Sequence, residues 1–249
     1  MSAYDDLMNY NRVTQALASV NGRTGWDQET MMPEGAGALR AEEMSALETV
    51  LHERRTSPKV GDWLDRADPS DDVAQANVRH IKREYERHTR VPADLAAAIA
   101  GHCSRAQRIW ADARAEDDVT AFLPTLSEMI SLKREEAAAV SQGGDVYDAL
   151  LADYEPGITG GELQTLFDNM RPRIVALRAR ALNAQRPEPL DREFDETLQM
   201  QVSTVLAKAF GYDMSIGRID KAVHPFSSGS GTDVRITTRT SARDPFNCF

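Results

Sequence analysis

Apolar residues recur at steps of three or four along most of the chain, which is the spacing of an amphipathic α-helix. The first such stripe consists of Leu7, Tyr10, Val13, Leu17 and Val20. Gly22 is expected to end this helix, because glycine weakens a helix interior and is common just beyond a helix end. The segment from Trp26 to Gly35 has no helical period and contains Pro33, so it is expected to form a loop or a helix entry.

Further helices are predicted by start signals that precede the same period. Ser57 with Pro58 pairs an N-cap residue with a proline at the first helical position, and Asp71 is another N-cap candidate. The last helical stripe consists of Phe194, Leu198, Val202, Val205 and Phe210. Because Gly211 follows this stripe, the sequence predicts a helical region over residues 1–212 and a mostly α fold.

Residues 213–249 have a different pattern. From Asp233 to Arg239 polar and apolar residues alternate, which is the period of a half-exposed strand. No segment upstream has a comparable strand pattern, although a strand needs a partner to be stable. We therefore expect a short edge strand near the C-terminus, protected by its charged residues.

Composition excludes several classes of protein. The 249 residues include 29 Lys and Arg against 39 Asp and Glu, a formal net charge of −10. This balance lacks the basic surface that nucleic acids and anionic membranes attract, so neither is expected as a partner. No apolar run approaches the roughly 18 residues of a membrane span, and the N-terminus does not have the pattern of a signal peptide. A cytoplasmic protein is therefore expected.

Histidine and cysteine positions give no strong metal or nucleophile motif. His52 is followed by Glu53, but the second histidine of a His-Glu-x-x-His zinc helix is missing. His80, Glu84 and His88 lie four residues apart on one predicted helix, so a metal site there is geometrically possible. The charged residues around them instead favour a solvated helix face.

The remaining candidates lie near the C-terminus. His224-Pro225-Phe226 places an imidazole beside an aromatic ring on a turn whose φ is fixed by proline. Arg235 offers a two-pronged donor for a carboxylate, and Asp233 could hold that donor in place. The alternative interpretation is an ordinary charged edge strand.

Several blocks of the sequence together resemble the carboxypeptidase Taq family of metallocarboxypeptidases. His224-Pro225-Phe226 followed by Asp233-Val-Arg235-Ile-Thr237 is similar to the HPF and DxRxT pair of that family. Residues 25–30, GWDQET, are similar to the family's N-terminal segment. Residues 147–157 are similar to its YDALL…YEPG segment, and residues 217–220, GRID, also match the family pattern. The blocks occur in the family's order, so the resemblance covers essentially the whole chain.

The resemblance implies a helical zincin-like metallocarboxypeptidase fold with a deep cleft, of which this chain is the N-terminal portion. Family members are homodimers that release single residues from peptide C-termini, using one divalent metal, usually zinc. By this resemblance residues 1–212 form the lid and cleft wall, and residues 213–249 form the HPF loop and the DxRxT strand. The implied substrate-binding residues are His224, Pro225, Phe226, Asp233, Arg235 and Thr237.

The chain departs from the family pattern at its end. The family's His-Glu-x-x-His helix follows DxRxT, and this sequence reaches Phe249 without it. We therefore expect no metal ligand, no bound metal and no general base in these 249 residues, and no peptidase activity from them alone. The alternative is a non-catalytic helical binding or dimerisation protein derived from the same fold. Apolar surface left without a packing partner is expected to favour a homodimer.

Overall fold

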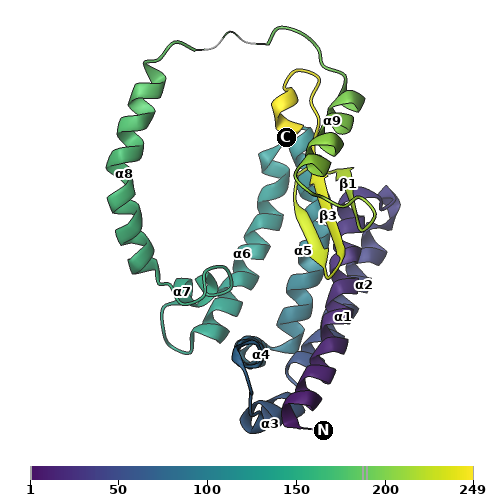
Figure 1. The fold of residues 1–249 in the computed structure, drawn as a ribbon, viewed down its shortest axis with the longest axis vertical. Coiled ribbons are helices and arrows are strands. Elements are labelled where there is room, and N and C mark those ends of the chain that lie inside the picture. The colour runs from purple at the N-terminus through teal and green to yellow at the C-terminus, as the bar shows by residue number, and fades with distance from the viewer. Residues whose placement is uncertain (1, 187, 189, 249) are drawn as a thin grey trace. The chain divides into compact units, whose positions relative to one another are not determined.

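The computed structural model describes residues 2–186, 188 and 190–248, and these are mostly helical (Figure 1). The helices are α1 (Ala3–Thr30), α2 (Gly37–Arg55), α3 (Pro58–Arg66), α4 (Asp72–Arg90), α5 (Ala93–Ala115), α6 (Val119–Ser141), α7 (Val146–Leu151), α8 (Gly160–Leu182) and α9 (Glu196–Ala209). The strands are β1 (Gly217–Lys221), β2 (Ser227–Ser230) and β3 (Asp233–Thr238). The predicted mostly α fold with β-structure near the C-terminus is confirmed.

The chain divides into two compact units, which are described separately. Unit 1 consists of Met1–Leu132 and Arg192–Phe249, and unit 2 of Lys133–Asp191. Residues on both sides of the predicted 212/213 division therefore belong to unit 1. The roles expected for 1–212 and 213–249 remain predictions.

The core of unit 1 joins the first, third and fourth helices. Leu7, Val60 and Ile81 are buried together, and Tyr10 and Trp63 pack against them with their rings 5.4 Å apart. Helix α2 packs along both α1 and α5. The predicted start signals hold here, since Pro58 lies at the start of α3 and the Asp71 carboxylate caps α4.

Helix α1 is longer than the sequence predicts. It continues through Gly22 to Thr30, so the expected helix end and the loop over residues 26–30 are wrong. Two contacts anchor the last turn to neighbouring helices: Arg40 donates to Asp27 at 2.7 Å, and the Gln28 side chain exchanges two hydrogen bonds of 2.8 Å with Ser104. A helical glycine costs only about 1 kcal/mol, which such tertiary contacts outweigh.

The strand that was expected at an edge lies in the middle of a three-stranded sheet. Strand β3 pairs in parallel with β1 and antiparallel with β2, so the order is β1-β3-β2 and the edge-strand prediction is wrong. The sequence does not predict β2 as a partner, because this strand is only Ser227–Ser230 and has no apolar alternation. Strand β2 also contacts α1, where the hydroxyls of Ser19 and Ser230 meet.

Helix α9 buries its polar side and exposes its apolar stripe. Gln199 is buried and donates to the Ser241 carbonyl at 2.8 Å, while Ser203 is buried beside Cys248. On the other side Val205 and Phe210 are 65% and 90% exposed. The expectation that some apolar surface is exposed is therefore confirmed.

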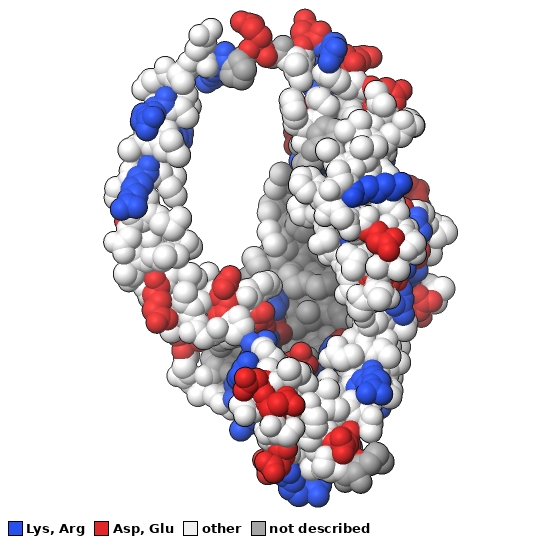
Figure 2. Space-filling view, viewed as in Figure 1, with Lys and Arg blue, Asp and Glu red and all other residues white. Residues whose placement is uncertain are grey.

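Uncharged side chains also predominate on helix α8 of unit 2. Figure 2 shows basic side chains interrupting an otherwise largely uncharged surface along this helix. Phe167, Ile174 and Leu177 of α8 are each more than half exposed. Among the residues that the structure describes, no helix combines the length and the apolar character needed to cross a membrane.

Candidate functional site

Two of the sequence blocks meet at one cavity of about 590 Å³ in unit 1. Its side chains come from the end of α1, from α5 and from the HPF loop, and Gly22 and Gly25 leave the α1 wall open. We call this cavity the aromatic pocket. The side chains that line it are those of Trp26, Glu29, Gln107, Trp110, His224 and Phe226.

Glu29 places a half-buried carboxylate in the aromatic pocket. Its Oε2 accepts a hydrogen bond of 2.7 Å from Gln107 Nε2, which fixes the side chain against α5. Burial raises the pKa of the Glu29 carboxyl above its ordinary value, while the Gln107 hydrogen bond and the nearby His224 oppose that rise. The pocket thus combines apolar walls with one oriented acidic group.

The HPF loop is tied to α5 immediately before His224. Arg114 NH1 donates to the Val223 carbonyl at 2.9 Å, and its guanidinium lies 5.4 Å from the centre of the Trp110 ring. The His224 ring meets the same Trp110 edge-on, with ring centres 6.2 Å apart. His224 itself is exposed, so its imidazole can reach a ligand in the pocket.

The loop is tied to β3 at Phe226. The Phe226 N–H donates to Thr237 Oγ1 at 2.7 Å, and the same hydroxyl donates to the Phe226 carbonyl at 2.9 Å. The Thr237 N–H also donates to that carbonyl, at 2.8 Å. Because Thr237 is 4% exposed and does not line the aromatic pocket, its structural role is to couple the HPF loop to the DxRxT strand.

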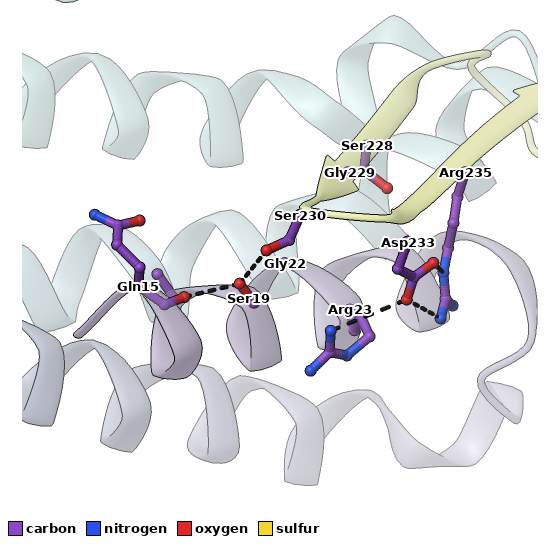
Figure 3. A pocket seen from close by; sticks show the side chains of 10 residues that line it. Gln15, Ser19, Gly22, Arg23, Ser228, Gly229, Ser230, Asp233 and Arg235 are labelled. Carbon is purple, nitrogen blue, oxygen red and sulfur yellow. Dashed lines mark hydrogen bonds and ion pairs between the residues drawn. The ribbon is translucent and has the colours of Figure 1, made fainter. Parts of the chain in front are cut away.

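Asp233 and Arg235 lie at a second cavity of about 210 Å³, between α1 and β2, which we call the arginine pocket (Figure 3). Arg235 donates through Nε and NH2 to the two carboxylate oxygens of Asp233, each at 2.8 Å. This hydrogen bonding lowers the pKa of the Asp233 carboxyl and raises that of Arg235. Arg23 approaches the same carboxylate at 4.0 Å. The predicted holding of Arg235 by Asp233 is therefore observed.

Trp26 of the aromatic pocket lies against Arg235, which lines the arginine pocket. The Arg235 guanidinium lies 4.2 Å and that of Arg218 4.7 Å from the centre of the Trp26 ring, which is 5% exposed. Arg218 is held by two hydrogen bonds of 2.6 Å to Asp220, and it lies beside Arg235 in the β1–β3 register. The GRID block thus supplies a second arginine–carboxylate pair next to that of DxRxT.

The six sequence-predicted site residues are distributed over these features. His224 and Phe226 line the aromatic pocket, Asp233 and Arg235 line the arginine pocket, Thr237 joins loop to strand, and Pro225 is half-buried between the two ring-bearing residues. Sequence reasoning did not place Glu29, Gln107 or Trp110 in the site. Gln107 and Trp110 are three residues apart and so share one face of a helix, which is the sequence signal that could have indicated their joint place in the site.

The YDALL…YEPG block lies in unit 2 and orders the start of α8. The Asp145 carboxylate caps α7, and Asp148 Oδ1 accepts from the Gly160 N–H at 2.7 Å. Thr159 and Glu162 cap α8 reciprocally. This block therefore has a local structural role within its own unit.

The described residues do not fit a metal centre. Across residues 2–186, 188 and 190–248 no three His, Cys, Asp or Glu side chains gather where they could hold a metal ion. On α4, His80 is exposed, and the ring Nδ1 of His88 lies 2.7 Å from the Glu84 backbone carbonyl. The interpretation of His80, Glu84 and His88 as a metal site is therefore not supported.

His88 is expected to make stability depend on pH. Burial lowers its pKa from 6.5 to about 4, and the charges of Arg55 and Arg87 act in the same direction. A neutral His88 therefore stabilises the fold fully above about pH 6.5, and this contribution is lost as the pH falls toward 4. The free energy of unfolding should drop by about 2 kcal/mol between pH 7 and pH 5 through this group.

Denaturant unfolding at the two pH values checks this prediction. His88→Gln should remove about that much of the pH dependence, whereas His80→Gln, at an exposed position of the same helix, should leave it unchanged. Identical pH dependence in wild type and His88→Gln would contradict the assignment.

Comparison with known proteins gives consistent matches. The family model described as Carboxypeptidase Taq (M32) metallopeptidase matches residues 6–249. Thermostable carboxypeptidase 1 of Thermus thermophilus is 38% identical, over 96% of this chain and 50% of its own length. The crystal structure of BsuCP matches with a TM-score of 0.93 at 26% sequence identity, over 99% of this chain and 51% of its own chain. The crystal structure of the M32 carboxypeptidase from Deinococcus radiodurans R1 matches with a TM-score of 0.81 at 28% sequence identity, over 99% of this chain and 51% of its own chain. The chain thus spans about half the length of these proteins.

Proposed function

The chain belongs to the carboxypeptidase Taq (M32) metallopeptidase family, and we propose that it forms the peptide-binding wall of an enzyme that releases single residues from peptide C-termini. The observation that carries this proposal is the junction of the family blocks in unit 1. Side chains of the WDQET and HPF blocks line one cavity, and the DxRxT strand is bonded to the HPF loop through Thr237. Three segments far apart in sequence thereby form one surface.

His224 is the residue that we propose to contact the substrate. It is exposed at the aromatic pocket, and the Arg114 and Thr237 tethers hold the backbone on both sides of it. An imidazole fixed in this way can donate a hydrogen bond to a peptide carbonyl or to the tetrahedral intermediate. Pro225 and Phe226 shape the same part of the wall.

Arg235 is better suited to organising the wall than to binding a peptide carboxylate directly. Both oxygens of Asp233 already accept from its guanidinium, and the rest of the group lies over the Trp26 ring. A substrate carboxylate would have to displace Asp233, which costs the partly buried pair its two charge-assisted hydrogen bonds. We therefore assign Arg235 and Asp233 to positioning Trp26 beside the aromatic pocket.

The metal centre and the general base are proposed to come from residues outside the described set, in the part of the relatives that this chain does not span. Zinc is the proposed metal, with another divalent ion as the alternative, and it would activate water and polarise the scissile carbonyl. On this proposal the 249 residues have no peptidase activity alone. A cytoplasmic homodimer remains our expectation, and the exposed apolar stripe of α9 supports self-association.

A chimaeric enzyme tests the residue assignments. Residues 1–249 are joined to the second half of the Thermus thermophilus relative, and kcat/KM is measured on a short peptide. His224→Ala should lower kcat/KM about tenfold or more, because a hydrogen bond to the reacting carbonyl is lost. His80→Ala, at an exposed position of α4, is the matched control and should have no effect. Equal activity of the two variants would contradict the role of His224.

A further inference from the structure

The aromatic pocket contains an acidic group that forms no ion pair with a described residue, although the nearby His224 favours its charged form. Glu29 Oε2 accepts from Gln107, but no described residue donates to Oε1 or forms an ion pair with this carboxylate. The carboxyl is half-buried, and its pKa is raised mainly by that burial. An opposite charge brought beside it would offset the cost of desolvating it.

The arginines around the pocket are already engaged elsewhere, and His224 forms no ion pair or hydrogen bond with Glu29 among the described residues. Arg235 and Arg218 are each bound by two hydrogen bonds to an aspartate, and Arg114 donates to the Val223 carbonyl. None of them contacts Glu29 among the interactions of the described residues. The acidic group is therefore available to a cation that comes from outside the chain.

The other side chains that line the aromatic pocket suit the long alkyl stem of a bound side chain. Trp26, Trp110 and Phe226 supply three aromatic rings, and two of these rings already lie within 5.4 Å of a guanidinium group. Aromatic faces attract ammonium and guanidinium groups as well as alkyl chains. A cavity of about 590 Å³ is also within the size range of small-ligand sites.

We propose that the aromatic pocket binds the cationic side chain of a lysine or arginine residue near the C-terminal end of the peptide. The alkyl stem packs on the aromatic rings, and the ammonium or guanidinium group pairs with Glu29. This inference rests on the proposed function, because it takes a peptide to be the ligand. It adds a substrate class, peptides with basic residues at their C-terminal end.

Peptide binding to the 249-residue chain tests the proposal without requiring hydrolysis. The probes are acetyl-Gly-Lys-Lys and acetyl-Gly-Nle-Nle, whose norleucine side chains have the same length but no charge. Affinity is measured by calorimetry at fixed ionic strength. The lysine peptide should bind at least tenfold more tightly than the norleucine peptide, and Glu29→Gln should reduce this preference to less than twofold.

Two controls separate a local pairing from the general attraction of an acidic protein. Glu34→Gln removes the same charge from an exposed position and should leave the preference intact. In the wild type, the carbon-13 resonance of the Glu29 carboxylate should shift with the lysine peptide only, which tests the contact even if Glu29→Gln fails to fold. Equal affinities, no measurable binding, or a preference that survives Glu29→Gln would overturn the proposal.

The outcomes also distinguish this inference from the function on which it rests. A cation preference in the chain together with an inactive chimaera would retain the pocket and reject the peptidase assignment. An active chimaera without any preference for lysine or arginine would reject the pocket alone.

Discussion

Replacing Gly217 with alanine is expected to lower the free energy of unfolding by about 3 kcal/mol. Gly217 begins β1 opposite Val234 of β3. A Cβ atom there would overlap the Tyr212 hydroxyl and the Val234 carbonyl oxygen. Either β1 separates from β3 or Tyr212 loses its hydrogen bonds of 2.5 Å to the Val234 carbonyl and 3.1 Å to that of Arg218.

Denaturant unfolding of matched variants measures this effect. Gly22→Ala is the control, because a Cβ on Gly22 meets nothing within 4 Å and removing a helical glycine should stabilise the protein by about 0.5–1 kcal/mol. Adding Tyr212→Phe to Gly217→Ala should restore only part of the loss, since the Val234 carbonyl still obstructs the new methyl group. Gly22→Ala should raise the free energy of unfolding and Gly217→Ala should lower it. Equal free energies of unfolding for the two variants would contradict this prediction.

Thr237→Val is expected to cost about 2 kcal/mol and to loosen the HPF loop. Valine has nearly the shape of threonine and suits a strand, so the loss arises from the hydroxyl. Without that hydroxyl the Phe226 N–H loses its acceptor, while the Phe226 carbonyl keeps the Thr237 N–H. Thr237→Ser retains the hydroxyl and should retain most of the stability.

The same pair of variants tests how the loop serves the site. In the chimaeric enzyme Thr237→Val should raise KM more than Thr237→Ser, because His224 and Phe226 are attached to β3 through this residue. Hydrogen exchange of the Phe226 amide should accelerate in Thr237→Val alone. Unchanged exchange and unchanged KM would show that the hydroxyl does not hold the loop.

The helical part of the fold was predictable because its signals are local. The apolar period, the proline at the start of α3 and the Asp71 cap depend only on residues close in sequence. The continuation of α1 past Gly22 was not predictable, since it depends on Arg40 and Ser104, which approach from other helices. Tertiary contacts of this kind override local propensity.

The sheet and the site show the same limit. β2 consists of serines and a glycine, and only its pairing with β3 makes it a strand. HPF and DxRxT could be recognised as blocks, but their coupling through Thr237 and the joining of Glu29 to Gln107 arise only when distant segments pack together. The spacing of residues along the sequence does not predict those contacts.

This chain is proposed to contribute a peptide-binding wall but no metal centre. The most direct test measures the release of C-terminal residues by two proteins. These are the 249-residue chain and its chimaera with the second half of the Thermus thermophilus relative. Each protein is assayed with added zinc and with a chelator, on the same peptide. We predict release by the chimaera that requires zinc and stops with chelator, and none by the chain alone. Chelator-sensitive release by the pure 249-residue chain would contradict this prediction, and a folded, metal-loaded chimaera without activity would favour the non-catalytic binding protein.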